Sequence, residues 1–201
     1  MRVSDDRYNR DRVRFDLAVR MIRHEARTCT IRSWTGLSDD RIRKLYRAYL
    51  LGQHAEPVRR HRGKSPQQIE YFLRSPALLF EATTLACLYS MLGLLPASAH
   101  DAEGPGVERG EQICQAYETY QALHQPARVS FEHASFLLLA LVRSDELDLA
   151  RCEPCGRLYL RDVLGGEQIR CTLCHVPRGG WRRRRIAGRA LLKPVGGSAR
   201  S

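Results

Sequence analysis

The sequence lacks a segment that could serve as a signal peptide, because its N-terminus is densely charged and has no apolar run. We therefore expect a cytoplasmic protein whose thiols stay reduced. It also lacks a phosphate-binding glycine loop and any catalytic signature, so we expect that it is not an enzyme. Acidic residues are few beside basic ones, 22 against 33, and the net charge of +11 favours an anionic partner such as nucleic acid or a membrane surface.

The charge is divided among regions of the chain. Residues 1–62 carry 16 basic and 8 acidic side chains, residues 63–150 carry 5 and 11, and residues 151–201 carry 12 and 3. Two basic ends therefore flank an acidic middle, which argues against a protein that coats RNA uniformly. We expect basic surfaces for nucleic acid and a separate central surface for another partner.

Four of the seven cysteines form two C-x-x-C pairs, Cys152 with Cys155 and Cys171 with Cys174, with 15 residues between the pairs. Two such pairs can surround one ion as a tetrahedron, and this spacing is typical of a zinc ribbon. We predict one structural Zn²⁺ per chain, because four thiolates leave no coordination position for water or substrate. Two disulfides are the alternative. His175 is a poor ligand, because it adjoins Cys174 and the tetrahedron is already complete.

The segment between the cysteine pairs predicts a short hairpin. Apolar residues at 158–160 and 163–164 are the strand candidates, and the glycines at 165–166 mark the turn. Gly156 follows the first pair at a place that favours a positive φ. Three arginines close in sequence could offset the negative charge of a zinc–thiolate site: Arg151, Arg157 and Arg170.

The N-terminal region predicts three helices. Apolar residues at helical spacing predict the first from Val13 to about Ala26, after a frayed start over residues 1–12. Thr28 is expected to cap a second helix that stops at Gly36. Ser38 is expected to cap a third that runs to about residue 51.

The third helix has an apolar stripe and an opposite charged face. Ile42, Leu45, Tyr46 and Tyr49 form the stripe. A short helix, a Thr-Gly-Leu-Ser turn and a helix with a cationic face are typical of a helix-turn-helix that reads double-stranded DNA. A merely solvated charged face is the alternative. The predicted DNA contacts here are Arg32, Arg41, Arg43, Lys44 and Arg47.

The middle of the chain predicts a helical bundle. Ser75 should cap an apolar helix over residues 76–95, which we expect to be buried all round rather than to span a membrane. Further helices are predicted from Ile113 to Pro126 and, capped by Ser130, over residues 131–150. Because this region has more apolar surface than a small unit hides alone, a partner interface is expected. The RRHR run at 59–62 lies in a preceding loop and either contacts phosphates or is solvated.

Three stretches resemble the FlhC family, the subunits of a flagellar master transcriptional regulator: TGLSDDRIRKLYRAYL, CEPCGRLY and IRCTLCHVPR. The likeness is closest over residues 28–50 and 151–178. It implies a bacterial activator that works with an FlhD subunit at flagellar promoters and engages RNA polymerase. It also implies that the four paired cysteines bind zinc, in agreement with their spacing.

The predicted fold is mainly α-helical with a small C-terminal four-cysteine, zinc-ribbon-like module. The predicted regions are a basic helix-turn-helix-like region (1–62), an acidic helical bundle and partner-binding region (63–150), the zinc ribbon (151–178) and a disordered basic tail (179–201). In the tail we predict phosphate contacts at Arg182, Arg183, Arg184 and Arg185. An RNA-binding or ribosome-associated zinc-ribbon protein is the alternative, disfavoured because RNA duplexes bury the groove that a recognition helix needs.

Overall fold

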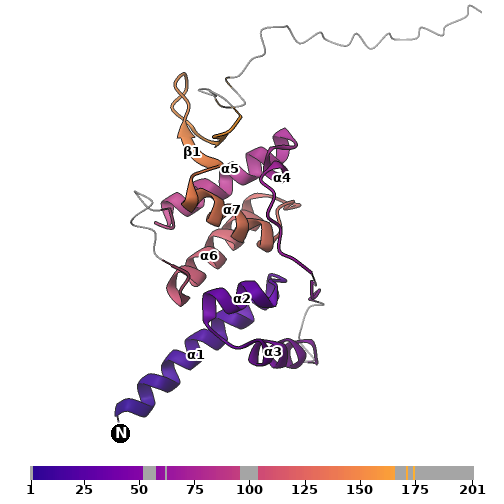
Figure 1. Cartoon of the computed structure of the whole chain (residues 1–201), viewed down its shortest axis with the longest axis vertical. Coiled ribbons are helices and arrows are strands. Elements are labelled where there is room, and N and C mark those ends of the chain that lie inside the picture. The colour runs from indigo at the N-terminus through magenta and orange to yellow at the C-terminus, as the bar shows by residue number, and fades with distance from the viewer. Residues whose placement is uncertain are drawn as a thin grey trace, which may run out of the picture.

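A computed structural model of the protein describes residues 2–51, 58–61, 63–95, 104–165, 171 and 174. These residues form a mainly helical fold with one small antiparallel strand pair, which confirms the predicted fold class. The elements are α1 (Arg2–Arg23), α2 (Thr28–Thr35), α3 (Asp39–Leu51), α4 (Glu70–Leu73), α5 (Pro76–Met91), α6 (Val107–Leu123), α7 (Phe131–Arg143), β1 (Leu147–Arg151) and β2 (Leu158–Asp162). Figure 1 shows α1–α3 at one end of the molecule, α4–α7 in the centre and the hairpin at the other end.

The first helix is longer than the apolar periodicity indicated, because it begins at Arg2 instead of near Val13. The part of the helix before Leu17 is rich in charged residues, and ion pairs at helical spacing join Arg12 to Asp16 and Arg14 to Asp11. Such pairs support a stretch of helix that has few apolar residues. The expected frayed start is therefore wrong for these residues.

The turn between α2 and α3 has the geometry that its sequence predicted. Gly36 adopts φ 67°, and its N–H donates to the carbonyl of Arg32 at 2.9 Å, so the helix ends in a left-handed residue. The start of α2 differs from the prediction, since Arg27 is the capping residue and Thr28 is already helical. The N–H of Arg27 donates instead to a side-chain oxygen of Glu132 on α7, at 2.7 Å.

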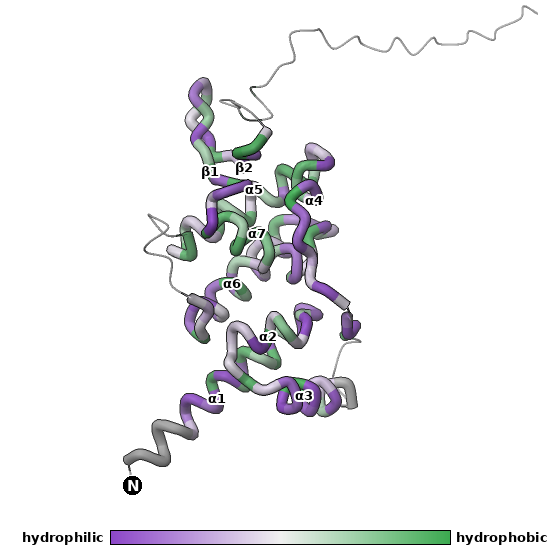
Figure 2. Tube along the Cα trace, in the orientation of Figure 1, coloured by the Kyte–Doolittle hydropathy of each residue, from purple (hydrophilic) through white to green (hydrophobic). Residues whose placement is uncertain are grey.

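One apolar core runs from α1 to the hairpin and includes Leu17, Trp34, Ile113, Leu138 and Leu160. Helices α1 and α2 pack against α6 at Gly110, where a Cβ would lie 2.6 Å from Cδ2 of Leu17 and 3.4 Å from Cβ of Trp34. Figure 2 shows hydrophobic stretches along α5 and α7 and a more hydrophilic α3.

Two of the central helices, α5 and α7, begin where their caps predicted, whereas α6 begins at Val107 and not at Ile113. The side-chain oxygens of Ser75 and Ser130 accept the N–H groups of Leu78 and His133. However, α5 is not buried all round, because Phe80 is 63% exposed. Among the residues that the structure describes, no helix is both long and apolar enough to cross a membrane.

Only one strand of the hairpin lies where it was predicted. The expected helix over 131–150 ends at Arg143, and the chain then enters β1, which pairs antiparallel with β2 so that Leu149 faces Leu160. Residues 158–160 form part of β2 as predicted, but their partner strand is β1 and not residues 163–164. The hairpin therefore encloses the first cysteine pair in its loop. The alternation of acidic and apolar residues from Glu146 to Leu149 is the strand signal, and it closely follows an apolar helix.

Candidate metal centre and nucleic-acid surface

The hairpin loop directs the first two thiols toward one point. The N–H of Cys152 donates to the carbonyl of Arg157 and the N–H of Gly156 to the carbonyl of Cys152, both at 2.8 Å. Gly156 has φ 68°, as the sequence predicted for this turn. The loop therefore closes tightly around Cys152 and Cys155.

The second pair completes a cluster of four sulfur atoms, which all lie within 4.8 Å of one another. The sulfurs of Cys155 and Cys171 are 3.7 Å apart. A tetrahedron with metal–sulfur bonds of about 2.3 Å has edges of about 3.8 Å. Four soft donors at these separations could hold a metal ion and are compatible with zinc.

The pKa values of two of the four thiols are shifted in opposite directions. Burial raises the pKa of the Cys152 thiol, but hydrogen bonds from the backbone of Cys171 and Cys155 outweigh it and leave that pKa lowered. The Cys174 thiol shares hydrogen bonds with Cys155 and Cys171, which raises its pKa. Because metal ligands must be deprotonated, a bound cation would favour the thiolate form of both.

The hairpin fixes the cysteine cluster to the helical bundle. Leu147 and Leu160 belong to the main core, and the N–H of Leu160 donates to the hydroxyl of Thr83 on α5 at 3.2 Å. Farther along the same strands, Tyr159 packs with the cysteines. Arg151 donates to the carbonyl of Gly156 at 2.7 Å, whereas Arg170 lies outside the described residues.

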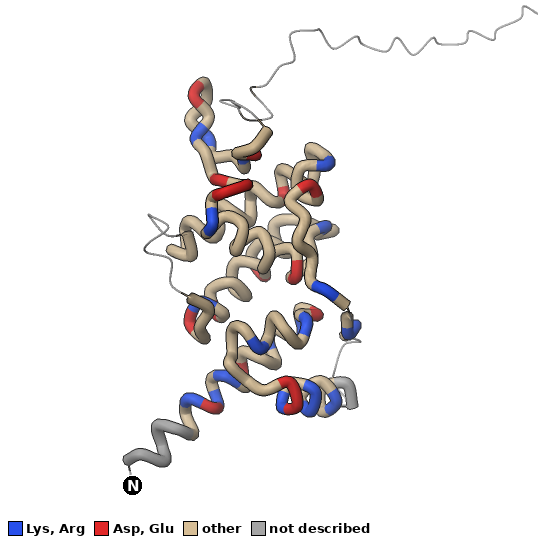
Figure 3. Tube along the Cα trace, viewed as in Figure 1, with Lys and Arg blue, Asp and Glu red and all other residues tan. Residues whose placement is uncertain are grey.

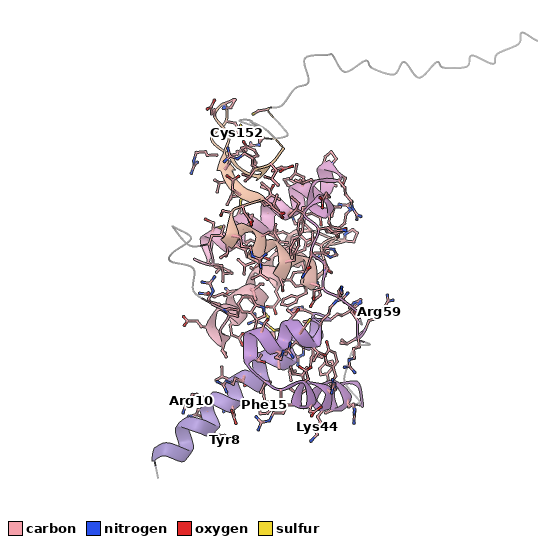
Figure 4. All side chains as sticks on the ribbon, in the orientation of Figure 1. Tyr8, Arg10, Phe15, Lys44, Arg59 and Cys152 are labelled. Carbon is pink, nitrogen blue, oxygen red and sulfur yellow. The ribbon has the colours of Figure 1, made fainter. Side chains whose placement is uncertain are left out.

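The predicted DNA-contact residues of α2 and α3 are brought together at the opposite end of the molecule. Arg32, Arg41, Arg43, Lys44 and Arg47 are all exposed, and the apolar stripe of α3 faces inward as predicted. Figure 3 shows blue positions gathered on α1 and α3, and Figure 4 shows Lys44 at this end and Cys152 at the other. The predicted tail residues, Arg182, Arg183, Arg184 and Arg185, lie outside the described part of the chain.

Three of these five cations have a carboxylate partner. The ion pairs join Arg32 to Asp39 at 3.2 Å, Arg43 to Asp40 at 2.9 Å and Arg41 to Asp11 at 4.0 Å. No ion pair joins Lys44 or Arg47 to any residue that the structure describes. The positive charge of α3 is therefore offset toward its N-terminus and not toward its C-terminal half.

Three further cations at this end were not among the predicted contacts. The guanidinium of Arg23 lies 5.9 Å from the ring centre of Tyr49, and that of Arg60 lies 5.4 Å from the ring centre of Tyr46. Arg59 is exposed and precedes Arg60 in the segment 58–61. The RRHR run was the available signal, but the sequence alone did not show where the segment lies.

Several acidic side chains of the central region form hydrogen bonds within the fold. Glu81, 1% exposed, accepts hydrogen bonds from the hydroxyl of Tyr120 and from the guanidinium of Arg128. Glu118 binds Arg20 of α1 through two hydrogen bonds, at 2.8 and 2.7 Å. Part of the negative charge of this region is therefore neutralised by arginines.

A comparison with curated proteins found no significant match. A comparison with protein families matched residues 8–187 to the family described as the flagellar transcriptional activator, FlhC. This match spans most of α1, all of α2–α7, the hairpin and all four clustered cysteines. The chain therefore belongs to the FlhC family of flagellar transcriptional activators.

Proposed function

We propose that the chain activates transcription by binding double-stranded DNA at promoters of flagellar genes, in a hetero-oligomer with an FlhD-like subunit. The observation that carries the DNA role is the exposed cationic face of α3, presented by a helix-turn-helix-like unit whose apolar stripe is buried. Family membership supports the activator role. Contact with RNA polymerase and a cytoplasmic location follow from that role.

The test of DNA binding removes the two unpaired cations of α3. Replacing Lys44 and Arg47 by Ala should weaken binding to a flagellar promoter duplex by about 1–3 kcal/mol for each base that is no longer read, with less effect on a scrambled duplex. The matched control replaces the exposed Arg74 and Arg143 of the central region, which removes the same charge. Equal weakening on both duplexes would contradict groove reading, and equally tight binding to an RNA duplex would favour the RNA-binding alternative.

The cysteine cluster is proposed to hold one structural zinc. Its four thiolates complete a tetrahedron, so the ion would stabilise the fold without a position for substrate, in line with a protein that is not an enzyme. Metal analysis of protein purified under reducing conditions should give one zinc per chain. Iron in the same ratio, or no metal, would contradict this assignment.

The partner subunit is proposed to cover an apolar face of α5. Phe80, Thr84, Cys87 and Met91 recur at helical spacing, and Phe80 and Met91 are 63% and 81% exposed. Leu123 of α6, 63% exposed, adjoins His124, whose ring lies 5.5 Å from that of Phe80. A continuous apolar face of this kind favours a stable protein interface.

Copurification tests this surface. Replacing Phe80 and Met91 by Ser should abolish recovery of a co-expressed FlhD-like subunit, whereas Leu164→Ser, at a 72% exposed site beyond β2, should not. Unchanged recovery of the subunit with the α5 variant would place the interface elsewhere.

A further inference from the structure

An acidic side chain, Glu25, binds the segment 58–61 at two places. Glu25, in the turn after α1, accepts a hydrogen bond from the backbone N–H of Arg59 at 3.1 Å. Its other oxygen lies 2.8 Å from Nε2 of His61. Glu25 itself has φ 60°, which places it in the left-handed region as the chain reverses between α1 and α2. Two contacts on one carboxylate therefore hold both ends of the Arg59–Arg60 dipeptide.

The tyrosines of α3 bring the arginines of other segments onto this helix. Arg60 reaches α3 at the ring of Tyr46, and Arg23 of α1 reaches it at the ring of Tyr49, about one helical turn farther on. An arginine within about 6 Å of a ring centre is attracted to the face of that ring. Both guanidinium groups are thereby held close to the part of α3 that carries Arg47, which follows Tyr46 in the helix.

We define the unpaired basic surface as Arg23, Lys44, Arg47, Arg59 and Arg60. All five side chains are exposed, and none of them forms an ion pair with a residue that the structure describes. Arg32, Arg41 and Arg43, by contrast, each have an Asp partner. Figure 4 shows Lys44 and Arg59 at the same end of the molecule and directed away from its body.

We propose that the segment 58–61 is a positioned phosphate-binding arm. In this arrangement the arginines of the unpaired basic surface that lie outside α3, Arg23, Arg59 and Arg60, are the main contacts with the DNA phosphates, while Lys44 and Arg47 face the groove. Arginines that neutralise phosphates release counterions, whereas an arginine paired with an aspartate already has a counter-charge and releases fewer. The planar guanidinium also suits bidentate hydrogen bonding to a phosphate. The phosphate contact is thus centred on the arm, beside the C-terminal half of α3, instead of on the start of α3.

This inference rests on the proposed DNA-binding function and adds which residues bind the phosphate backbone of the DNA. Its test compares three double variants of the full chain, copurified with its partner subunit. Binding is measured by fluorescence anisotropy on promoter and scrambled duplexes at several salt concentrations. Arg59→Ala with Arg60→Ala removes two cations of the arm. The matched control, Arg32→Ala with Arg43→Ala, removes two cations that have aspartate partners.

The arm variant should reduce the slope of log K against log salt by roughly 1.8, or about 0.9 for each phosphate no longer neutralised, on both duplexes alike. The control should reduce it by clearly less. Arg59→Lys with Arg60→Lys keeps the charge and should retain the slope, which separates the effect of charge on phosphate binding from the effect of the ring contact. Unfolding temperatures of all variants establish that the fold is intact.

Three results would overturn the proposal. An unchanged slope in the arm variant, with normal DNA binding by the wild type, overturns this inference and leaves the proposed function standing. Equal changes in the arm variant and in the control show that pairing with aspartate does not matter. Absence of DNA binding by the wild-type complex overturns the proposed function and the inference together.

Discussion

The two ends of the molecule are held together by different means. The α1–α3 end buries large apolar side chains such as Leu17, Ile31 and Ile42 in the core that it shares with the central helices. The cysteine end has a separate cluster in which only Cys152, Tyr159 and Cys171 are buried, among the residues that the structure describes. So small a cluster cannot stabilise itself by burial, and we therefore expect its order to depend on the proposed zinc. The comparison predicts that either end can be disrupted with limited effect on the other.

The largest effect is expected from removing a metal ligand. Cys152→Ser, Cys174→Ser or treatment with a strong chelator should unfold the residues around the cluster, because binding of a structural zinc supplies most of their folding free energy. Amide NMR spectra should lose the resonances of this end and keep those of α1–α3.

The matched control is Cys29→Ser, at an exposed cysteine outside the cluster, which should leave the spectrum unchanged. Loss of the helical signal throughout the chain after chelation would refute the independence of the two ends.

The second largest effect is expected from a substitution at the other end, where Glu132 of α7 joins the N-terminal helices to the bundle. Its carboxylate is 6% exposed and accepts hydrogen bonds from Arg27, Thr30 and Ser65. Glu132→Ala should lower the free energy of unfolding by about 3–5 kcal/mol, because the half-buried guanidinium of Arg27 loses its ion-pair partner and the three hydrogen bonds are lost. Denaturant titration measures this loss.

Glu108→Ala, at an exposed acid in the first turn of α6, serves as the control and should cost less than about 1 kcal/mol. Similar losses in both variants would show that the network around Glu132 does not hold the two parts together.

A smaller effect is expected where α1 crosses α6. Gly110→Ala should destabilise the protein by about 1–3 kcal/mol, although Ala is the better helix former, because its Cβ would meet buried Leu17. Gln115→Ala, at an exposed site of the same helix, should change stability by no more than about 0.5 kcal/mol. A rise in unfolding temperature for Gly110→Ala would mean that the contact between α1 and α6 adjusts freely.

The smallest expected effect is a loss of stability at low pH, at the same contact between α1 and α6. Hydrogen bonds from Arg20 lower the pKa of Glu118 to about 2, against the opposing effect of burial and with help from His24. Because the folded-state pKa is depressed, the stabilisation is present above the ordinary pKa of 4.5 and is lost as pH falls toward 2.

Glu118 is 41% exposed, so the contribution is modest. The measurement compares denaturant unfolding of the wild type and Glu118→Gln at pH 6 and pH 3. The wild type should lose more stability than the variant between these values, and equal losses would show that Glu118 is not responsible.

Local patterns in the sequence were enough to predict the cysteine cluster and the buried stripe of α3. Both depend on spacing within a few residues, since a C-x-x-C pair fits one turn and helical periodicity defines a face. The position of β1 was missed because its alternating residues directly follow the apolar helix α7. The ion pair between Asp11 and Arg41 was also beyond prediction, because it joins separate helices. Which arginines remain available for an anion is therefore a property of the fold.

The hairpin implies an order of assembly for the proposed metal centre. Its strands are anchored in the bundle through Leu147 and Leu160, so Cys152 and Cys155 are positioned as a half-site once the bundle has folded. We expect an incoming ion to add Cys171 and Cys174 to this half-site, and a preorganised half-site lowers the entropy lost on binding. The full chain should accordingly bind zinc more tightly than a peptide of residues 151–178 in a competition with a chromogenic chelator. Equal affinities would mean that the bundle does nothing to prepare the site.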